Sequence, residues 1–462
     1  MTPTSHVTTR PPGSHDAVIV IPGIMGSELV DVTTGNTLWG LADASWYVSA
    51  WTTGQGLRNL QVTDPDPERE HRRVRATRLL RFPAFMPVLT GMEPYTRLME
   101  RIAQVVQRPE ALRPFPYDWR LPVAHNAALL ARVIEAHLKA WRWRAESHGP
   151  GGNRARVVLV AHSMGGLLVQ ELARIPGALD EVRAIITLGT PFLGSLDAVR
   201  MLSEGAGSPF PLPRRRLQAL ARTLPSVYEL LPAYRCVQDN GVLRHLAAGD
   251  LAVDSDSVPS DRAAVRTLPL PGHRCLVGLG QPTFQSMTLR SGDVEVHHGI
   301  PDEHATAGAD LLDHSGDGTV YRYSAELRQA ERTYVHQSHG ALARCKEAMD
   351  HVCAVISEDD QGAPLGGGEL GLEVPDVVHA GEPFTFAVTG SQSAGASCYV
   401  VDLSTGGVQE SPVLRYGDAT HGGRRAGELL LTEPGLYRVA AAGGSGSPVT
   451  RLLLAAGRGD KP

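Results

Sequence analysis

Ser163 stands in a sequence pattern that suits a serine nucleophile. The stretch from Val157 to Leu168 reads VVLVAHSMGGLL, which predicts a buried strand, a sharp turn at the serine and then a helix. A nucleophile elbow needs small flanking residues because strand and helix pass closely there. Ala161, Gly165 and Gly166 supply that space, with Ala161 in place of the first glycine of the GxSxG pattern. An unreactive serine beside a glycine-containing helix cap is the alternative interpretation.

A serine hydroxyl is a poor nucleophile at neutral pH, so it needs a general base and a group that orients that base. In an α/β-hydrolase these residues follow the serine in the order acid, then histidine. The turn SGDGTV offers Asp317, and the loop VHQSHG offers His339, with His336 in reserve. The alternatives are a plain Asp-Gly turn residue for Asp317, and a helix-capping or solvent-facing histidine for His339. His162 is expected to pack beside the elbow, because the base approaches from another loop.

Three further aspartates, Asp302, Asp310 and Asp313, are rival acids or charges of a lid. Their mixture with His304 and His314 also suggests a metal site. No HExxH spacing supports that interpretation, so the sequence predicts neither a metal nor another cofactor.

The backbone must also stabilise the oxyanion of the tetrahedral intermediate with two N–H donors. One comes from the residue after the nucleophile and the other from the loop after an early strand. Met164 and Ile24 fit these roles, since the sequence PGIMGS from Pro22 to Ser27 directly follows the first predicted strand. A glycine-rich turn without a ligand is the alternative for this loop.

Hydrophobic runs that end in turns predict the strands that position these residues. The runs are AVIVI (Ala17 to Ile21), VVLV (Val157 to Val160), AIITL (Ala184 to Leu188) and CLVGL (Cys275 to Leu279). Apolar residues at helical spacing predict helices over 126–141 and 341–356. Strands that alternate with helices imply a parallel, doubly wound sheet.

The composition of the sequence changes after residue 356, where an acidic and then glycine-rich stretch is typical of a linker. Short alternating segments follow, and they resemble a small all-β sandwich of immunoglobulin-like type. The predicted organisation is a flexible N-terminus (1–15), an α/β catalytic domain (16–356) with a cap insertion at about 39–90 and a lid at about 200–266, a linker (357–369), a β-sandwich domain (370–457) and a tail (458–462).

Composition excludes several classes of protein. The chain has 462 residues with 44 Lys+Arg and 49 Asp+Glu, which gives a net charge of −5. No run of consecutive basic residues stands out except Arg214 to Arg216, which argues against nucleic-acid binding. Five cysteines without a CxxC pair indicate reduced thiols. The sequence shows no signal peptide and no apolar stretch of about 18 residues, so we expect a cytoplasmic protein.

Six motifs together resemble the lecithin:cholesterol acyltransferase family, which includes lysosomal phospholipase A2 and phospholipid:diacylglycerol acyltransferase. They are VIPGIMGSEL (Val20 to Leu29), FPYDWR (Phe115 to Arg120), AHSMGG (Ala161 to Gly166), TLGTPFLGS (Thr187 to Ser195), PSVYELLP (Pro225 to Pro232) and GDGTV (Gly316 to Val320), in family order over about three quarters of the chain. The resemblance implies an α/β-hydrolase fold with cap and lid insertions, and lipid esters as substrates. It implies an acyl-Ser163 intermediate with Asp317 and His339 as partners, and oxyanion donors at Ile24 and Met164.

The chain also departs from this family. No cysteine precedes Cys236, so the disulfide-closed surface loop of secreted relatives has no counterpart here. The spacing from Asp317 to His339 is short for the family. The C-terminal β-domain has no role that the resemblance assigns.

An aromatic segment, WGLADASWYVSAW from Trp39 to Trp51, lies in the predicted cap and precedes an arginine-rich stretch. Aromatic rings with a polar edge suit a membrane interface, and nearby cations suit anionic headgroups. We therefore predict peripheral membrane contact through Trp46, Tyr47 and Trp51. Packing of these rings within the cap is the alternative.

The sequence thus predicts a serine-dependent acyl hydrolase or O-acyltransferase that acts on a lipid ester, with phospholipid as the expected substrate. A carboxylesterase for a soluble ester is the second hypothesis. The third is an inert hydrolase-like scaffold that binds a protein partner through its β-domain.

In the FPYDWR motif, Asp118 is expected to start the helix near Pro122, and Arg120 is expected to pair with a carboxylate.

Overall fold

The structure is a computed structural model of the whole chain. It describes residues 13–40, 54–80, 95–146, 154–208, 212–239, 242–251, 270–290, 293–301, 311–359, 370–390, 393–403, 424–443 and 447–457, together with residues 253, 268, 405, 407–410, 412 and 414–416. Most of the predicted N-terminal segment, most of the linker, parts of the cap and the lid, and the predicted tail lie outside these residues.

Six parallel strands form the central sheet, in the order β15-β10-β7-β6-β1-β5. Their bounds are β1 (Ala17–Ile21), β5 (Leu112–Pro114), β6 (Val157–His162), β7 (Val182–Leu188), β10 (His273–Leu279) and β15 (Glu331–His336). The four hydrophobic runs of the sequence all lie in this sheet. Every residue of β1 is buried, as expected for a strand that is covered on both faces. The predicted α/β class with a parallel sheet is confirmed.

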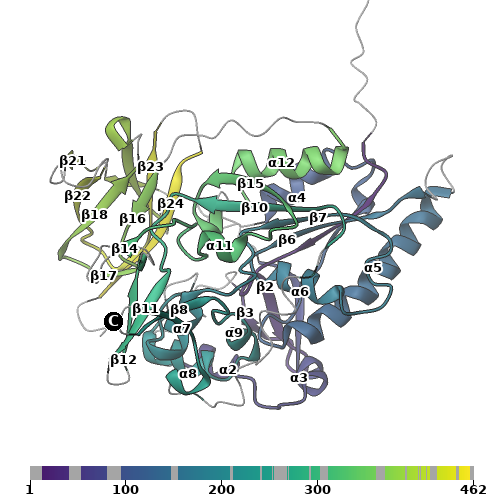
Figure 1. The fold of residues 1–462 in the computed structure, drawn as a ribbon, viewed down its shortest axis with the longest axis horizontal. Coiled ribbons are helices and arrows are strands. Elements are labelled where there is room, and N and C mark those ends of the chain that lie inside the picture. Colours follow the sequence, from purple (N-terminus) through teal and green to yellow (C-terminus); the bar gives the residue numbers. More distant parts are fainter. Residues whose placement is uncertain are drawn as a thin grey trace, which may run out of the picture.

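Helices cover both faces of the central sheet. Figure 1 shows α4 and α12 on one face and α5 and α6 on the other. Their bounds are α4 (Thr96–Ala103), α5 (Val123–Glu146), α6 (Gly165–Leu172) and α12 (Lys346–Ser357). The helix predicted over 341–356 begins later than expected, because residues 339–341 form a separate 3-10 turn before it. That turn carries His339.

Two insertions extend the fold below the central sheet in Figure 1. The first holds β2 (Ser27–Asp31), β3 (Thr37–Trp39), β4 (Val74–Leu79), α2 (Gln55–Asn59) and α3 (Pro67–Arg73). The second holds α7 (Leu196–Ser203), α8 (Arg214–Ala221), α9 (Pro225–Glu229), β8 (Arg235–Asp239) and β9 (Val242–His245). After β10 follow β11 (Ser286–Arg290), β12 (Asp293–His297), β13 (Ile300–Pro301), β14 (Leu311–Leu312) and α11 (Arg322–Ala325).

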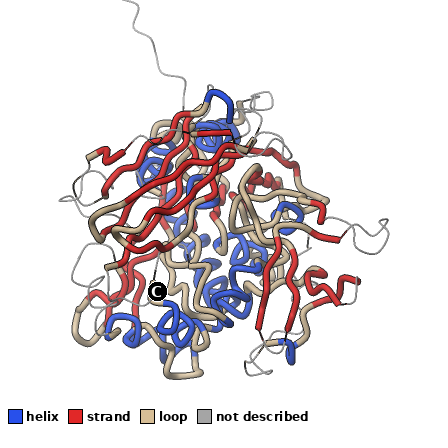
Figure 2. Tube along the Cα trace, turned by 90° about the vertical axis from the view of Figure 1, so that its left-hand side faces the viewer, coloured by secondary structure: helices blue, strands red, loops and turns tan. Residues whose placement is uncertain are grey.

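The C-terminal residues from 370 to 457, called the β-domain below, form two sheets that share one hydrophobic core. One sheet has the order β16-β18-β22-β21, with β16 (Gly371–Glu373), β18 (Pro383–Thr389), β21 (Arg415–Tyr416) and β22 (Arg425–Leu430). The other has the order β17-β24-β23-β19-β20, with β17 (Val377–His379), β19 (Ser397–Asp402), β20 (Val408–Glu410), β23 (Gly435–Ala442) and β24 (Val449–Ala456). Figure 2 shows strands of the β-domain in red toward the viewer.

All five cysteines are buried and free. Within the described ranges, no helix combines the length and the apolar character that a membrane span requires.

Candidate active site

Ser163 directly follows β6, at the carboxyl end of the central sheet. Its φ angle of 53° lies in the left-handed region, which costs a non-glycine residue about 1–3 kcal/mol. Backbone hydrogen bonds hold this conformation. Ser163 N–H donates to the carbonyl of Leu188 at 2.9 Å, and its own carbonyl accepts from Gly166 N–H at 3.0 Å. The serine thus occupies a sharp strand-to-helix turn of the kind that a nucleophile elbow requires.

The small residues around Ser163 are needed for close backbone contacts. A Cβ atom at Gly165 would lie 2.5 Å from the carbonyl oxygen of Pro22, and one at Gly166 would collide with the side chain of Thr190. Cβ atoms essentially never come this close to other heavy atoms, so larger residues would displace the loop of Pro22 or the segment of Thr190 that follows β7. Ala161 is fully buried, which fits a small side chain at that position.

Ser163, His339 and Asp317 form one hydrogen-bonded line. His339 Nε2 lies 2.9 Å from Ser163 Oγ, and His339 Nδ1 lies 2.7 Å from Asp317 Oδ2. The other oxygen of Asp317 accepts from the N–H groups of Thr319 at 3.0 Å and Val320 at 2.7 Å, which fixes the carboxylate. A carboxylate only accepts, so the Nδ1 atom carries the proton of a neutral imidazole. Nε2 is then free to accept the hydroxyl proton of the serine.

The structure does not bring His336 to Ser163. His336 ends β15, where it pairs with Leu279, and its ring lies against Gly280. Asp313 is engaged elsewhere, because its carboxylate accepts from Ser315 N–H at 2.7 Å and from the amide of Gln285.

The ring of His314 contacts Tyr321 and Tyr323. The remaining candidate residues lie outside the described residues. For the alternative acid or metal site these are Asp302, His304 and Asp310, and for the predicted membrane contact they are Trp46, Tyr47 and Trp51.

The loop from Pro22 to Ser27, called the oxyanion loop below after the role that the sequence predicts for it, lies against Ser163. A Cβ atom at Gly23 would fall 2.8 Å from the Cβ atom of Ser163. In the described part of the chain, the N–H groups of Ile24 and Met164 have no hydrogen-bond acceptor. Two such N–H groups beside a serine are available to a substrate oxygen, and helix α6 begins directly after Met164, so its positive end favours an anion there.

Three buried aromatic side chains hold the backbone of the oxyanion loop. Tyr117 donates from its hydroxyl to the carbonyl of Pro22 at 3.0 Å, Trp119 donates to Ser27 at 3.2 Å, and Trp39 donates to Met25 at 2.9 Å. Two of these anchors belong to the FPYDWR motif. The aromatic rings of this motif therefore have a structural role, because they fix the loop that offers the Ile24 N–H group.

The charged residues of the same motif form a buried ion network. Arg120 pairs with Asp118 at 2.7 Å and with Glu70 at 3.1 Å, and all three side chains are at most 1% exposed. The expected carboxylate partner of Arg120 is thus present. The helix-capping role expected for Asp118 is wrong, because the first N–H of α5, that of Val123, donates to Glu229 at 2.7 Å instead. The carboxylate of Asp118 is occupied by the guanidinium.

A second hydrogen-bonded chain connects the oxyanion loop to the backbone of His339. Gly23 N–H donates to the hydroxyl of Tyr95 at 2.8 Å, that hydroxyl lies 3.0 Å from His162 Nδ1, and His162 Nε2 lies 3.1 Å from the carbonyl of His339. Burial lowers the pKa of His162 to about 3, so its ring is neutral. Because a carbonyl only accepts, Nε2 carries the proton and Nδ1 accepts from the Tyr95 hydroxyl. Each donor and acceptor of this chain therefore has a defined role.

Replacing Tyr95 by phenylalanine removes the hydroxyl that joins this chain. The Gly23 N–H and His162 Nδ1 then lose their partners in a buried site, which costs about 1–3 kcal/mol for each group. We expect kcat for ester hydrolysis to fall by about 10- to 100-fold with little change in KM, because small displacements of reacting groups are costly. Steady-state kinetics on a soluble p-nitrophenyl ester measures this.

Tyr228→Phe is the matched control for Tyr95→Phe. It removes a hydroxyl that donates to the carbonyl of Arg222 at 3.1 Å, outside the site. A similar loss of kcat in both variants would show that Tyr95 acts on general stability only.

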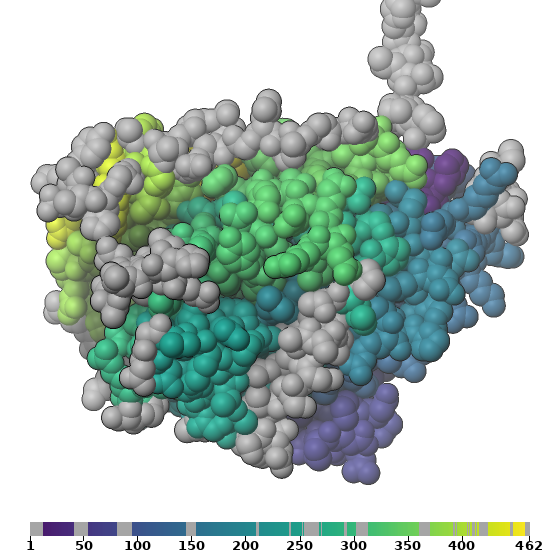
Figure 3. All heavy atoms as spheres, viewed as in Figure 1, coloured from purple at the N-terminus to yellow at the C-terminus, as the bar shows by residue number. Residues whose placement is uncertain are grey.

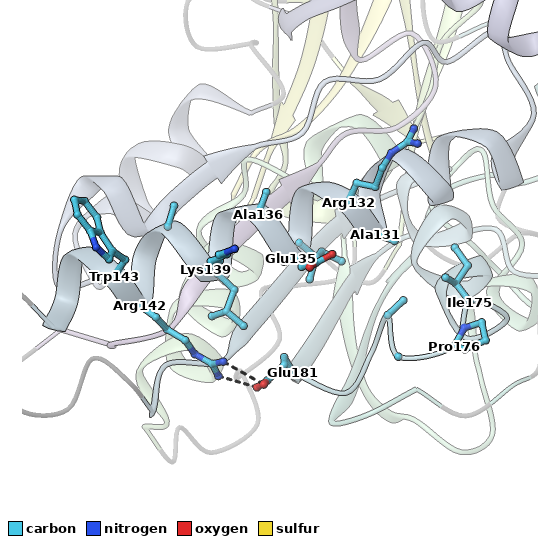
Figure 4. Close-up of a pocket in the computed structure, with 15 residues that line it drawn as sticks. Ala131, Arg132, Glu135, Ala136, Lys139, Arg142, Trp143, Ile175, Pro176 and Glu181 are labelled. Carbon is cyan, nitrogen blue, oxygen red and sulfur yellow. Dashed lines mark hydrogen bonds and ion pairs between the residues drawn. The ribbon is translucent and has the colours of Figure 1, made fainter.

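A surface groove of about 1060 Å³ lies along α5, away from these residues. Figure 4 shows Trp143 and Lys139 on the helix and Ile175 and Pro176 opposite, with Arg142 paired to Glu181 at 2.7 Å. No residue of the serine, aspartate or histidine loops lines this groove. We therefore do not assign it to the acyl substrate.

The parallel sheet, the serine elbow after β6 and the histidine loop after the last strand define the α/β-hydrolase fold. The model of the lecithin:cholesterol acyltransferase family matches residues 84–267. The resemblance that the motifs predict is thereby confirmed.

Known relatives agree with this similarity. The chain is 28% identical to a lysosomal phospholipase A and acyltransferase of Bos taurus, over 50% of this chain and 56% of the relative. It is 27% identical to a phosphatidylcholine-sterol acyltransferase of Papio anubis, over 54% and 59%. The chain thus spans less than two thirds of these relatives. A crystal structure of the Bacillus licheniformis lipase BlEst2 in its mature form is 15% identical, with a TM-score of 0.30, over 74% of this chain and 91% of that one.

Sequence reasoning did not find Tyr95 or the anchoring role of the FPYDWR rings. Tyr95 lies 67 residues from His162 along the chain and belongs to no motif. The aromatic density of FPYDWR was a signal, but only the fold shows which backbone groups the rings reach.

Proposed function

We propose that this protein is a serine-dependent lipid acyl hydrolase or O-acyltransferase that acts through an acyl-Ser163 intermediate. The observation that carries the proposal is the line from Asp317 through His339 to Ser163 Oγ, with distances of 2.7 and 2.9 Å. The lipid class of the substrate, with phospholipid as the expected donor, is supported by the similarity to the lecithin:cholesterol acyltransferase family and to the relatives named above.

In the acylation step, Ser163 Oγ attacks the ester carbonyl carbon while His339 Nε2 takes the hydroxyl proton. Asp317 stabilises the imidazolium that forms. The carbonyl oxygen becomes an oxyanion, which the N–H groups of Ile24 and Met164 stabilise. The intermediate then collapses, the C–O bond to the leaving alcohol breaks, and that alcohol takes the proton from His339.

In the second step, water or an alcohol attacks the acyl-Ser163 carbonyl and gives its proton to His339. Collapse returns that proton to Ser163 Oγ and releases a fatty acid or a new ester. The acceptor therefore decides between hydrolysis and acyl transfer. The chemistry of the chain's own residues is the same in both cases.

Lipid mass spectrometry tests the proposal. The protein is incubated with vesicles of mixed phospholipids, with and without a sterol or a diacylglycerol. We expect lysophospholipid with free fatty acid, or with an acylated acceptor. Turnover of a soluble ester without any product from phospholipid would support the carboxylesterase hypothesis instead. Failure of Ser163 to react with a fluorophosphonate probe would support the inert scaffold.

Peripheral membrane contact stays a prediction, since Trp46, Tyr47 and Trp51 lie outside the described residues. Trp39, which begins the same segment, is buried and packs edge-to-face on Trp119. Cosedimentation with anionic vesicles, compared between the wild type and a Trp46→Ala/Trp51→Ala variant, tests the contact. The cytoplasmic location and the domain boundaries also stay predictions.

We infer that the β-domain is of immunoglobulin-like type. Its two sheets share a core, and the hydroxyl of Tyr437, near the start of β23, donates to the carbonyl of Glu433 at 2.8 Å. Such a tyrosine corner occurs where the chain crosses between sheets of an immunoglobulin-like sandwich. An experimental structure with a different strand order would contradict this inference. A protein partner of the β-domain also stays a prediction, which affinity purification with the full chain as bait would test.

A further inference from the structure

The β-domain packs on the side of the α/β unit that carries β10 and β15 (Figure 1). In the space-filling view of Figure 3, its yellow-green surface adjoins the green surface of the chain that precedes it. Several residues of the α/β unit at this contact come from the loops that follow the two strands. These are the loops that carry Asp317 and His339.

The two residues before His339 both bond to the β-domain. Gln337 donates from its side-chain amide to the carbonyl of Pro448 at 3.4 Å, and the hydroxyl of Ser338 donates to the carbonyl of Thr450 at 3.3 Å. Both side chains are at most 5% exposed. Gln337 also accepts from the Ser338 N–H at 2.9 Å, so the pair forms one unit. The β-domain therefore holds the backbone that leads directly into His339.

The segment after His339 is also held by β24, the strand that contains Thr450. Arg344 donates from Nη2 to the hydroxyl of Thr450 at 2.7 Å. Thr450 thus contacts both sides of the histidine loop, through its carbonyl on one side and its hydroxyl on the other. Farther along, Glu347 in the first turn of α12 accepts from the hydroxyl of Ser447 at 3.0 Å.

Arg451, the residue after Thr450 in β24, covers the turn of Asp317. Gly318 has a φ angle of 92°, and a Cβ atom there would collide with the guanidinium of Arg451. Gln281 connects this turn to the first strand of the β-domain. Its N–H donates to the carbonyl of Gly316 at 3.0 Å, and its buried side chain donates to the carbonyl of Leu370 at 2.8 Å.

The nucleophile and the oxyanion loop have their described hydrogen bonds within the α/β unit. Ser163 N–H donates to Leu188, and the oxyanion loop is held by Tyr117, Trp119 and Trp39. The β-domain therefore contacts the loops that carry Asp317 and His339 rather than the turn that carries Ser163. The interface also joins polar groups, as is typical of contacts between domains of one chain.

We propose that the β-domain is a positioning element for Asp317 and His339, and that Thr450 and Arg451 are the positioning residues. This inference rests on the proposed function, because it requires these two side chains to act on Ser163. Docking of β24 sets the distance and direction of His339 Nε2 relative to Ser163 Oγ. A displacement of about 1 Å at reacting groups is enough to cost about 100-fold in rate.

The test uses the full chain with Thr450→Val, Arg451→Ala and the double variant. Valine keeps the shape of Thr450 but removes the acceptor for Arg344, whereas Thr450→Ser retains that acceptor. We expect kcat on a soluble p-nitrophenyl ester to fall about 10- to 100-fold in the double variant, with KM within about twofold. Labelling of Ser163 by a fluorophosphonate should slow by a similar factor. The Thr450→Ser variant should keep most of the wild-type rate.

Val408→Ser is the matched control. Val408 is 63% exposed on β20, at the opposite edge of the same sheet from β17 and β24, and this variant should retain the wild-type kcat. Melting temperatures are measured for all variants, and Thr450→Val alone serves if the double variant does not fold.

The outcomes separate this inference from the proposed function. An unchanged kcat in Thr450→Val and Arg451→Ala, or a loss confined to KM, would overturn the positioning role while wild-type turnover persists. A loss of kcat in Thr450→Ser as large as the loss in Thr450→Val would also contradict the positioning role. A wild-type protein without turnover and without labelling at Ser163 would instead contradict the proposed function.

Discussion

Replacing Ser163 by alanine is expected to lower kcat for acyl release from phosphatidylcholine vesicles by about 10⁶-fold. The alanine side chain has no atom that can form the acyl bond, while the oxyanion loop and the His339 ring remain in place. The binding of substrate should therefore change little. Release of fatty acid, measured by mass spectrometry, and the loss of fluorophosphonate labelling both report on this step.

Ser203→Ala is the matched control for Ser163→Ala. The hydroxyl of Ser203 donates to the carbonyl of Val199 at 2.8 Å on α7, so its removal also deletes one hydroxyl from the α/β unit. We expect this variant to keep the wild-type rate. Full activity in Ser163→Ala would rule out an acyl-Ser163 intermediate.

Local sequence patterns were sufficient for the central sheet and for the candidate residues of the site. The strand AVIVI had to be buried on both faces, because no polar residue interrupts it. The position of Ser163 followed from small residues that a close strand-to-helix turn requires. Asp317 and His339 followed from their order along the chain. Each of these inferences depends on a short segment and its neighbours.

The supports of the site could not be predicted in this way. Tyr95 meets Gly23 across 72 residues, and Thr450 meets Arg344 across 106 residues. Such contacts depend on how distant elements pack, and a single tyrosine or threonine has no pattern that announces them. The misassigned Asp118 shows the same limit. Its local spacing suited a helix cap, but a buried guanidinium two residues away is the stronger partner.

The second large effect is expected at Asp317. In Asp317→Asn, one oxygen still accepts from the N–H groups of Thr319 and Val320, so the turn keeps its shape. The introduced amide nitrogen then faces His339 Nδ1 and donates to it. The imidazole must carry its proton on Nε2, where it donates to Ser163 Oγ and cannot accept the hydroxyl proton.

We therefore expect Asp317→Asn to lower kcat by about 10⁴-fold while the melting temperature and KM stay close to the wild type. Asp313→Asn is the matched control, because Asp313 is the rival acid of the same segment and bonds to Ser315 rather than to His339. Rates on a p-nitrophenyl ester compare the two variants. A large loss in Asp313→Asn with a small loss in Asp317→Asn would reverse the assignment of the acid. Both substitutions replace one carboxylate by one amide, so a difference in rate between the two variants reports on the position of the proton on His339.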